Sequence, residues 1–322
     1  MKVHLPVSLC VLAIVLSGCG AQSMILDSQG AYLLTVTDVL ARPTQTVSLR
    51  AKLQGGDLLR PQAGYVIRFF QDGGPIIAAQ TNSDGLAEAH FTPQSQGDYF
   101  FTADPASVGF DGPVPKPRKI MVACRPTDAR MAIVDLDKTV VASGFHTVLI
   151  GKAEPMAGSA EVLERLSATH TIVYLTHRPE YFGPRSKAWL SEHGYPRGPV
   201  LLSSTEGFLS GSGQYKREAL AGLRKSFSRI EIGIGDKISD AAAYHRNGLK
   251  SFLVYQIPSD ADAAELSAQI EALSELPEAV QVVENWQQVA KALFADRNYP
   301  RSAMQAKLLQ LHGERTAVEA EK

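Results

Sequence analysis

The sequence predicts an α/β fold, a parallel sheet flanked by helices, preceded by a smaller all-β domain. From about residue 130 onward, apolar strand-like runs alternate with helical segments, which is typical of a parallel sheet covered on both faces. Before about residue 105, short runs of alternating apolar and polar residues are separated by turn residues, which is typical of half-buried antiparallel strands. We therefore expect two domains in the 322 residues.

The composition is that of an ordinary folded protein, with 45% hydrophobic and 20% charged residues. The formal net charge is -1. Binding to a phosphate backbone needs a concentrated basic surface, and this balance does not suggest one. We expect no nucleic-acid partner.

The first residues have the features of a secretory signal. Lys2 precedes an apolar stretch at residues 5–16 that is too short to span a bilayer as a stable helix. The stretch ends in LSGC, which resembles a bacterial lipobox, in which the cysteine, here Cys19, is acylated and becomes the mature N-terminus. A plain signal peptide is the alternative. We expect a lipoprotein signal peptide at 1–19 and lipidation at Cys19.

An acylated Cys19 implies a membrane anchor, because several acyl chains hold a protein firmly at a bilayer surface. The resemblance therefore implies a lipid-anchored protein of the bacterial cell envelope. Gly20 stands where inner-membrane lipoproteins have a retention-type Asp. This favours the outer membrane, facing the periplasm.

Residues 30–105 are predicted to form a small β-sandwich. The expected strands are 46–53, 65–70, 75–80, 86–91 and 99–103. The segments between them are rich in Gly, Asn and Asp, which tolerate the positive φ of tight turns. The pieces GYVIRFFQDGG and IIAAQTNSDGLAEAHFTPQSQGDYFFTA resemble bacterial immunoglobulin-like repeats. The sequence does not show whether this domain binds a partner or acts as a spacer.

Residues 106–128 are predicted to be a linker, because three prolines within 113–117 favour an extended, semi-rigid chain. The α/β domain is expected at 129–296, and a polar tail, helical or frayed, at 297–322. The expected strands of the α/β domain are 131–136, 171–175, 200–202, 229–234, 251–255 and 280–283. The expected helices are 156–168, 179–192, 215–227, 239–247, 260–273 and 286–294.

Two carboxylates follow the first strand of the α/β domain, in the run MAIVDLDKTVV. Asp135 and Asp137 are spaced i, i+2, so in an extended segment they point to the same side, just past the carboxyl end of the strand. Open α/β sheets bind their ligands there. Two carboxylates held so close repel each other unless a proton or a cation lies between them, so the spacing suggests a Mg²⁺ site. A polar turn that ends the strand is the alternative.

Further polar residues follow other predicted strands or lie near the start of a predicted helix. Thr176 ends the strand 171–175, and Lys216 lies near the start of a helix. Asp236 follows the strand 229–234, and Asp240 comes four residues later. Since parallel strands end at one edge of the sheet, we expect these side chains to lie near Asp135.

The order DLDKT, strand-terminal threonine, helix-borne lysine and GDxxxD resembles the four motifs of the haloacid dehalogenase superfamily. The segments YLTHRPEYF, GYPRGPVLLSS, QYKREALAGLRKSF and GIGDKISDAAAYHRNGL are similar to the lipin-type and actin-patch-type phosphatidate phosphatases. The resemblance covers roughly residues 130–255. One departure is Lys138, where lipin-type enzymes usually have glycine. It either attracts a second phosphate charge or faces solvent.

The resemblance implies a Mg²⁺-dependent phosphatase. Asp135 would be the nucleophile that forms an aspartyl-phosphate, and Asp137 the general acid and base. Mg²⁺ would be held by Asp135, by Asp137 through its backbone carbonyl, and by Asp236, an all-oxygen set. Asp240 would orient the lysine or a metal-bound water.

The same resemblance implies the residues that bind phosphate. Thr176 and Lys216 would hold the phosphoryl oxygens, with Arg217 as a rival to Lys216. Arg178 either binds a phosphate or headgroup or is merely solvated. The intervals between these motifs leave no room for an inserted cap domain, and an open site favours large or membrane-embedded substrates.

The leading hypothesis is hydrolysis of a lipid phosphate such as phosphatidate. A soluble phosphomonoester is a second possible substrate. A third hypothesis is a lipid-phosphate binding module or sensor, because related domains of phosphatidylinositol-transfer proteins have lost the catalytic aspartate and only bind. An adhesin led by the β-sandwich is a further alternative, which the intact motif set disfavours.

Overall fold

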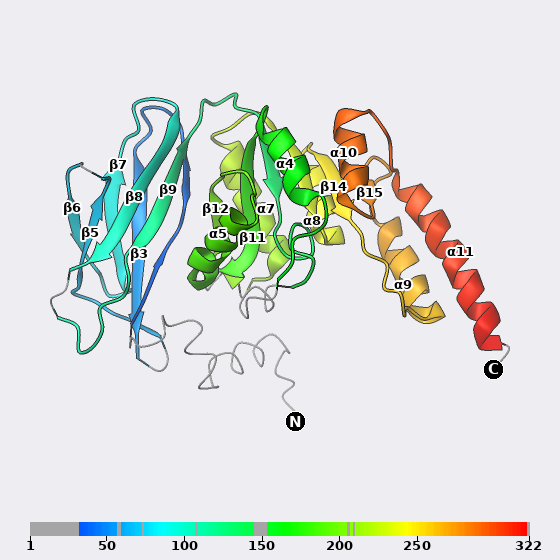
Figure 1. The fold of residues 1–322 in the computed structure, drawn as a ribbon, viewed down its shortest axis with the longest axis horizontal. Coiled ribbons are helices and arrows are strands. Elements are labelled where there is room, and N and C mark those ends of the chain that lie inside the picture. The colour runs from blue at the N-terminus through cyan, green and yellow to red at the C-terminus, as the bar shows by residue number, and fades with distance from the viewer. Residues whose placement is uncertain are drawn as a thin grey trace. The chain divides into compact units, whose positions relative to one another are not determined.

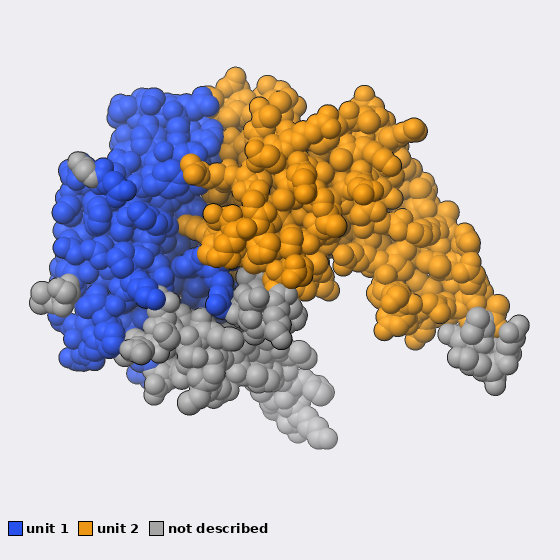
Figure 2. All heavy atoms as spheres, viewed as in Figure 1, with its two compact units in different colours: residues 1–125, 179–186 blue, residues 126–178, 187–322 orange. Residues whose placement is uncertain are grey.

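The computed structural model describes residues 32–56, 59–72, 74–106, 109–144, 153–204, 207–208 and 210–320. The predicted signal peptide and Cys19 lie outside them. The chain divides into two compact units, shown in Figure 2: unit 1 runs to Arg125 and includes 179–186, and unit 2 comprises 126–178 and 187–322. No helix in the described ranges is both long enough and apolar enough to cross a bilayer.

Unit 1 contains two sheets in its described part (Figure 1). The first sheet consists of β1 (Tyr32–Val36), β3 (Val47–Gly55), β4 (Arg60–Pro61) and β7 (Leu86–Phe91). The second has the order β2 (Val39–Ala41), β9 (Arg118–Cys124), β8 (Gly97–Pro105), β5 (Val66–Phe70) and β6 (Ile77–Gln80). All the strand pairs are antiparallel except β2 with β9.

The two sheets share one apolar core, and the side-chain alternation of their strands explains it. In β3 every second residue from Val47 to Gly55 is buried, so these residues line one face of the strand. Leu49 of β3 joins a cluster with Phe69 of β5, Phe101 of β8 and Ile120 of β9. The N-terminal part is therefore rich in β-structure, as predicted.

The predicted linker at 106–128 contains a strand that the sequence analysis missed. The prolines of 113–117 precede β9 and do not belong to it. The next residues, from Ile120 to Cys124, are apolar and fully or almost fully buried, and β9 pairs with both β8 and β2. Proline content led to the linker prediction, whereas the apolar run that follows the prolines decides the structure.

Unit 2 is built on a parallel sheet, as the sequence predicts. Its order is β12 (Val200–Ser203), β11 (Thr171–Pro179), β10 (Met131–Val134), β13 (Ile230–Gly235), β14 (Lys250–Val254) and β15 (Gln281–Val283). The pairs β10 with β11, β10 with β13, β13 with β14 and β14 with β15 are all parallel. The central strands β10 and β13 thus bring Asp135 and Asp236 to one edge of the sheet.

Helices follow the strands and cover the sheet (Figure 1). They are α4 (Ser159–Ser167), α5 (Gly183–Glu192), α7 (Ser212–Arg224), α8 (Ile238–Arg246), α9 (Ala263–Ser274), α10 (Trp286–Phe294) and α11 (Arg301–Ala320). The 3₁₀ turn η1 (Glu180–Phe182) and the first residues of α5 belong to unit 1. Alternate residues of β14 enter different cores: Phe252 and Val254 pack in one cluster, and Leu253 packs in another. Both faces of the sheet are therefore covered.

The predicted polar tail at 297–322 consists largely of helix α11, so the helical alternative holds for residues 301–320. Met304 and Leu308 are spaced i, i+4, lie on one face of the helix, and are buried in the cluster that includes Leu266 and Leu273 of α9. The segment is polar on average, but this short apolar stripe attaches it to unit 2.

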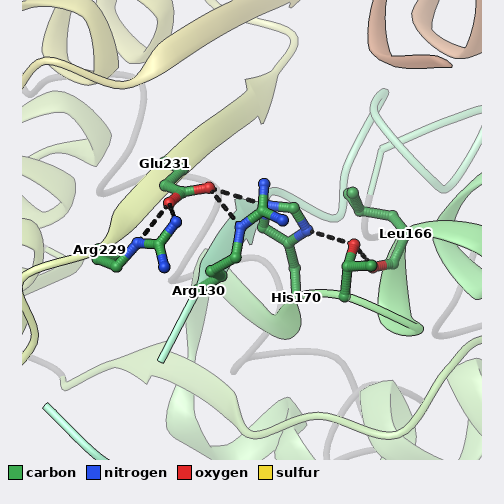
Figure 3. Close-up of polar contacts among 6 residues, drawn as sticks. Arg130, Leu166, His170, Arg229 and Glu231 are labelled. Atoms are coloured by element: carbon green, nitrogen blue, oxygen red, sulfur yellow. Dashed lines mark hydrogen bonds and ion pairs between the residues drawn. The ribbon is translucent and has the colours of Figure 1, made fainter. Parts of the chain in front are cut away.

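A charged network joins the beginnings of three neighbouring strands (Figure 3). Glu231 of β13 accepts from Arg130 at 2.8 Å, is 2.7 Å from Arg229, and accepts from His170 Nε2 at 3.2 Å. Burial lowers the pKa of His170, and the charge of Arg130 lowers it further. Burial alone would raise the pKa of Glu231, but its bonds to Arg130 and Arg229 hold it below the ordinary value.

Candidate active site

Asp135 lies directly after β10 and is held by the pairing of β10 with β13. Its amide donates to the carbonyl of Ile234 at 2.9 Å, which continues the ladder between the strands. Its Oδ1 accepts from the amide of Leu136 at 2.8 Å, and its Oδ2 is 2.7 Å from Lys216 Nζ. The residue is only 4% exposed. A carboxylate oriented in this way is suited to act as a nucleophile.

Lys216 comes from α7 and reaches the same point as Asp135. Its side chain is fully buried, and its Nζ is also 2.5 Å from Asp240 Oδ2. Burial alone would lower the pKa of Lys216, but the carboxylates of Asp135 and Asp240 outweigh it and hold the pKa well above its ordinary value. Lys216 therefore stays charged. Its neighbour Arg217, the rival in the sequence analysis, is exposed.

Three carboxylates form an acidic cluster at the edge of the sheet. One oxygen from each of Asp135, Asp236 and Asp240 lies within 4.8 Å of the other two. Asp236 Oδ1 and Asp240 Oδ1 are buried and accept no hydrogen bond within the described ranges. Burial, with the charges of Asp135 and Asp240, raises the pKa of Asp236 to about 7. Buried oxygens without a donor, on carboxylates that repel each other, fit a divalent cation such as Mg²⁺.

Asp240 and Tyr244 lie one turn apart on α8 beneath the cluster. Burial raises the pKa of Asp240, against the opposing charge of Lys216. Tyr244 is fully buried, its hydroxyl has no hydrogen-bond partner among the described residues, and burial raises its pKa. The sequence analysis missed this tyrosine. The i, i+4 spacing from Asp240, which puts both on one helix face, is the signal that could have found it.

Asp137 is not one of the three carboxylates of the acidic cluster, and its side chain pairs with Arg178. The guanidinium donates from Nε to Asp137 Oδ2 at 3.0 Å and from NH2 to Asp137 Oδ1 at 2.8 Å. Arg178 is 3% exposed, whereas the Asp137 side chain is 26% exposed. The sequence analysis expected Arg178 to bind a phosphate or solvent. Its planar fork pairs with both oxygens of Asp137 and orients that carboxylate, and binding of a phosphate by Arg178 stays a prediction.

Thr176 and His177 belong to the carboxyl end of β11. Thr176 is buried, and its Oγ1 accepts from the amide of Arg178 at 3.3 Å. His177 Nε2 donates to the carbonyl of Gly207 at 3.2 Å, and the ring stacks on Phe208 with 4.9 Å between centroids. Burial lowers the pKa of His177. This strand thus contributes a buried hydroxyl near the edge that bears the carboxylates.

The turn after Asp137 has an unusual backbone. Lys138 is exposed and has φ 53°, in the left-handed region that favours glycine. A side chain in this conformation costs on the order of 1 kcal/mol. The turn is fixed on either side, because the Lys138 amide donates to Ser143 and Trp286 Nε1 donates to the Thr139 carbonyl at 2.7 Å.

A cavity of about 860 Å³ opens next to the acidic cluster. It is lined by Lys138, Asp236, residues 254–259, Glu284, Lys307 and Leu311. Since Asp236 belongs to both, the cavity is continuous with the cluster. Sequence reasoning did not find it, because its walls come from segments that are far apart in the chain.

The fold and site define an α/β domain with a buried carboxylate, a buried lysine and an acidic cluster at the carboxyl edge of a parallel sheet. Residues 132–258 match the family model described as PITM 1-3, LNS2 domain. An LNS2 domain is a lipin-like domain, related to the haloacid dehalogenase superfamily, of the phosphatidate phosphatase type. The match includes Asp135, Lys216 and Asp240 and suggests a function of the lipid-phosphatase type.

Three of the similar solved structures have 11–16% sequence identity to this chain. A chimeric titin Z1Z2 is 16% identical, with 30% of this chain and 97% of that chain covered and a TM-score of 0.21. The Ig1-2 module of the Drosophila receptor protein tyrosine phosphatase DLAR is 13% identical, with 34% and 63% covered and a TM-score of 0.22.

A glycosyl hydrolase family 2 member from Bacteroides cellulosilyticus is 11% identical, with 77% of this chain and 35% of that chain covered and a TM-score of 0.28. Similarities this weak support no statement about fold or function. A search of curated proteins finds no significant match to the chain.

Proposed function

We propose that unit 2 is a Mg²⁺-dependent phosphomonoester hydrolase that acts on a lipid phosphate, such as phosphatidate, through an aspartyl-phosphate. The observation on which the proposal rests is the environment of Asp135. One carboxylate oxygen is fixed by the Leu136 amide, and the other lies against the ammonium of Lys216, beside the acidic cluster. The LNS2 match supports the lipid-phosphatase class.

In the proposed reaction a carboxylate oxygen of Asp135 attacks phosphorus, and the bond from phosphorus to the ester oxygen breaks. Asp137, oriented by Arg178, would enter this step protonated, give that proton to the leaving oxygen and then, as a carboxylate, take one from the attacking water. That water releases inorganic phosphate and regenerates Asp135. Lys216 offsets negative charge at the nucleophile throughout.

The metal would be held by Asp135, Asp236 and Asp240, whose oxygens fit a hard divalent cation. When bound, Mg²⁺ supplies positive charge that offsets the charge of the phosphoryl oxygens. It would also give the buried Oδ1 atoms of Asp236 and Asp240 a partner. In this proposal Thr176 would hold a phosphoryl oxygen.

The predictions made for the N-terminal part of the chain agree with this function. Acylation at Cys19 would place the protein in the bacterial cell envelope, at the outer membrane facing the periplasm, where a lipid substrate is at hand. We propose that unit 1 is an immunoglobulin-like domain that acts as a spacer or binds a partner. Its two-sheet core is consistent with such a domain.

The test is phosphate release from phosphatidate in neutral detergent micelles by the full-length chain, with Mg²⁺ or with EDTA. We expect activity with Mg²⁺ only, and a loss on the order of 1,000-fold or more in kcat for Asp135→Asn, because the amide is a poor nucleophile. Asp128→Asn is the matched control, since Asp128 is exposed. Activity that survives Asp135→Asn would exclude the aspartyl-phosphate mechanism.

A second candidate function is a non-catalytic lipid-phosphate sensor. The observation that favours it is the match to the family model described as PITM 1-3, LNS2 domain. Asp135 and Asp137 are both retained here, which favours catalysis. Binding to phosphatidate vesicles without turnover of any lipid or soluble phosphomonoester would decide for the sensor.

A further inference from the structure

The cavity beside the acidic cluster is formed largely by the C-terminal part of the chain. Asp236 and residues 254–258 lie within the stretch that matches the LNS2 model. Glu284, Lys307 and Leu311 lie beyond it. Lys307 and Leu311 belong to α11, which is anchored to unit 2 by Met304 and Leu308. This wall is therefore a feature of the present chain outside the matched stretch.

The charges in the cavity leave one cation without a partner. Lys307 Nζ pairs with Glu284 at 2.5 Å, and Asp236 belongs to the acidic cluster. Lys138, at the end of the cavity nearest Asp137, has no ion pair or side-chain hydrogen bond within the described ranges. An ammonium in this position can attract an anionic group that enters the cavity.

The backbone at Lys138 gives a second, independent reason to look for a role. With φ 53° the residue is in a conformation that glycine adopts without strain. The side chain is exposed, so packing does not explain a lysine there. Backbone strain that better packing does not offset is typical of residues at functional sites.

We propose that the cavity is the subsite for the group esterified to the reacting phosphate, and that Lys138 selects substrates with a second anionic group in it. The inference rests on the proposed phosphatase function. The substrate class is a phospholipid whose headgroup ends in a phosphate. Its terminal monoester would lie at Asp135 and its phosphodiester at Lys138, with the start of the acyl chains against Ile257 and Leu311.

The size and lining of the cavity agree with this class. A volume of about 860 Å³ is in the range of pockets for drug-sized ligands, enough for a glycerol phosphate headgroup and the first carbons of the chains. The lining includes the apolar residues Val254, Ile257 and Leu311 and the polar residues Lys138 and Gln256. An amphipathic group needs both.

The experiment compares two lipids with identical acyl chains in neutral detergent micelles with Mg²⁺. Phosphatidylglycerol phosphate has a terminal monoester and a phosphodiester, whereas phosphatidate has only the monoester. We expect full-length wild-type protein to prefer phosphatidylglycerol phosphate in kcat/KM. In Lys138→Gly, which suits the left-handed backbone, this preference should fall about 10- to 100-fold, which is the size expected for loss of one charge contact.

Matched variants separate the effect of the charge of Lys138 from the other effects of replacing this residue. Lys138→Arg should keep the preference, and Lys138→Ala should lose it. Lys225→Ala, at an exposed lysine that does not line the cavity, should leave the ratio unchanged. Leu311→Trp, which fills the cavity, should lower the kcat/KM of phosphatidylglycerol phosphate relative to that of p-nitrophenyl phosphate. An unchanged ratio between the two lipids in Lys138→Gly overturns the role of Lys138.

Failure of the proposed function can be told apart from failure of this inference. If the wild type hydrolyses neither lipid, catalysis is wrong, and calorimetric titration with the same micelles then decides the subsite. If phosphatidylglycerol phosphate binds more tightly than phosphatidate, and this difference depends on Lys138, the proposed subsite is supported. Equal binding of the two lipids, or a preference that Lys138→Gly retains, excludes it.

Discussion

Lys216 is the residue on which the charge balance of the site depends. Its ammonium lies between the carboxylates of Asp135 and Asp240, and all three side chains are nearly or fully buried. In a buried ion pair the attraction mainly offsets the loss of hydration, so removing one partner leaves charges that nothing compensates. Lys216 therefore has a structural role in addition to any contact with phosphate.

We predict that Lys216→Met lowers the free energy of unfolding by about 3–5 kcal/mol at pH 7 in EDTA. The loss should be smaller at pH 5. Without the lysine, carboxylates that have raised pKa values in the fold bind protons more readily than in the unfolded chain, so stability rises as the pH falls. Urea unfolding followed by tryptophan fluorescence measures this, because both tryptophans, Trp189 and Trp286, are buried in unit 2.

Lys225→Met is the control for this prediction, since Lys225 is exposed at the end of α7. It should change stability little at either pH. An equal loss at pH 7 and pH 5 in Lys216→Met would show that lost packing, and not uncompensated charge, is the cause.

Lys138 gives a second prediction at the scale of one residue. Lys138→Gly should raise the free energy of unfolding by about 1 kcal/mol, because glycine relieves the left-handed backbone. Lys225→Gly, at φ -65°, should instead lower it by roughly 0.5–1 kcal/mol. A decrease in both variants would mean that φ is not the source of strain at residue 138.

Sequence reasoning finds the residues of the site better than their pairings. Asp135 and Asp236 could be placed together because each follows a strand of one parallel sheet. The bidentate pairing of Arg178 with Asp137 could not, because side chains more than forty positions apart in the chain meet only through the tertiary fold. The same holds for the cavity wall contributed by Leu311.

At the scale of elements, the contact between β13 and α8 positions the acidic cluster. A Cβ built on Gly233 would lie 2.3 Å from Tyr244 Cγ, so α8 packs directly against the main chain of Gly233. Asp240 lies one turn before Tyr244 on the same helix. The position of this carboxylate therefore depends on the close approach at Gly233.

We predict that Gly233→Ala lowers the free energy of unfolding by about 2–3 kcal/mol, because α8 must move to make room. The apparent Mg²⁺ affinity should fall with it. Gly222→Ala in α7 is the matched control: nothing lies within 4 Å of its added Cβ, so it should stabilise by about 0.5–1 kcal/mol. A Gly233→Ala variant as stable as wild type would contradict the packing.

The apolar period of unit 2 predicts its strands and most helices, because buried parallel strands are short apolar runs between turn signals. Strand β9 was missed because the preceding prolines dominated the interpretation. The strands β1, β2 and β4 were also missed. Two of them have only two or three residues, so no period can be seen.

At the scale of the whole molecule, the network around Glu231 makes stability depend on pH. Burial lowers the pKa of His170 below that of the unfolded chain, so the unfolded state binds the proton more readily. Stability is therefore lost as the pH falls from about 6.5 through the lower pKa of the folded state. Glu231, whose pKa is also lowered, adds a loss only at more acidic pH.

We predict that His170→Gln removes the contribution of His170 to the change of unfolding free energy between about pH 7 and 5, while the opposite contribution of Asp236 remains, because glutamine keeps a donor for Glu231 but does not titrate. Urea unfolding by tryptophan fluorescence at a series of pH values measures the slope. His245→Gln, outside the network, is the comparison. A slope unchanged by His170→Gln would place the pH dependence elsewhere.

The organisation into a β-rich part and a parallel α/β part could be predicted, because the hydrophobic period changes from one to the other. The grouping of residues 179–186 with unit 1 could not. These residues follow directly on Arg178, and only tertiary contacts, such as the ion pair of Glu180 with Lys52, decide to which unit they belong.

The hydrogen bond from the Asp135 amide to the Ile234 carbonyl has a consequence for heat inactivation. The backbone of Asp135 is part of the ladder between β10 and β13, so we expect it to stay ordered as long as these two strands stay paired. Activity should then persist up to the temperature at which unit 2 unfolds and vanish with it. The proposed activity would then be lost in the same cooperative transition as the fold of unit 2, with no inactive native form in between.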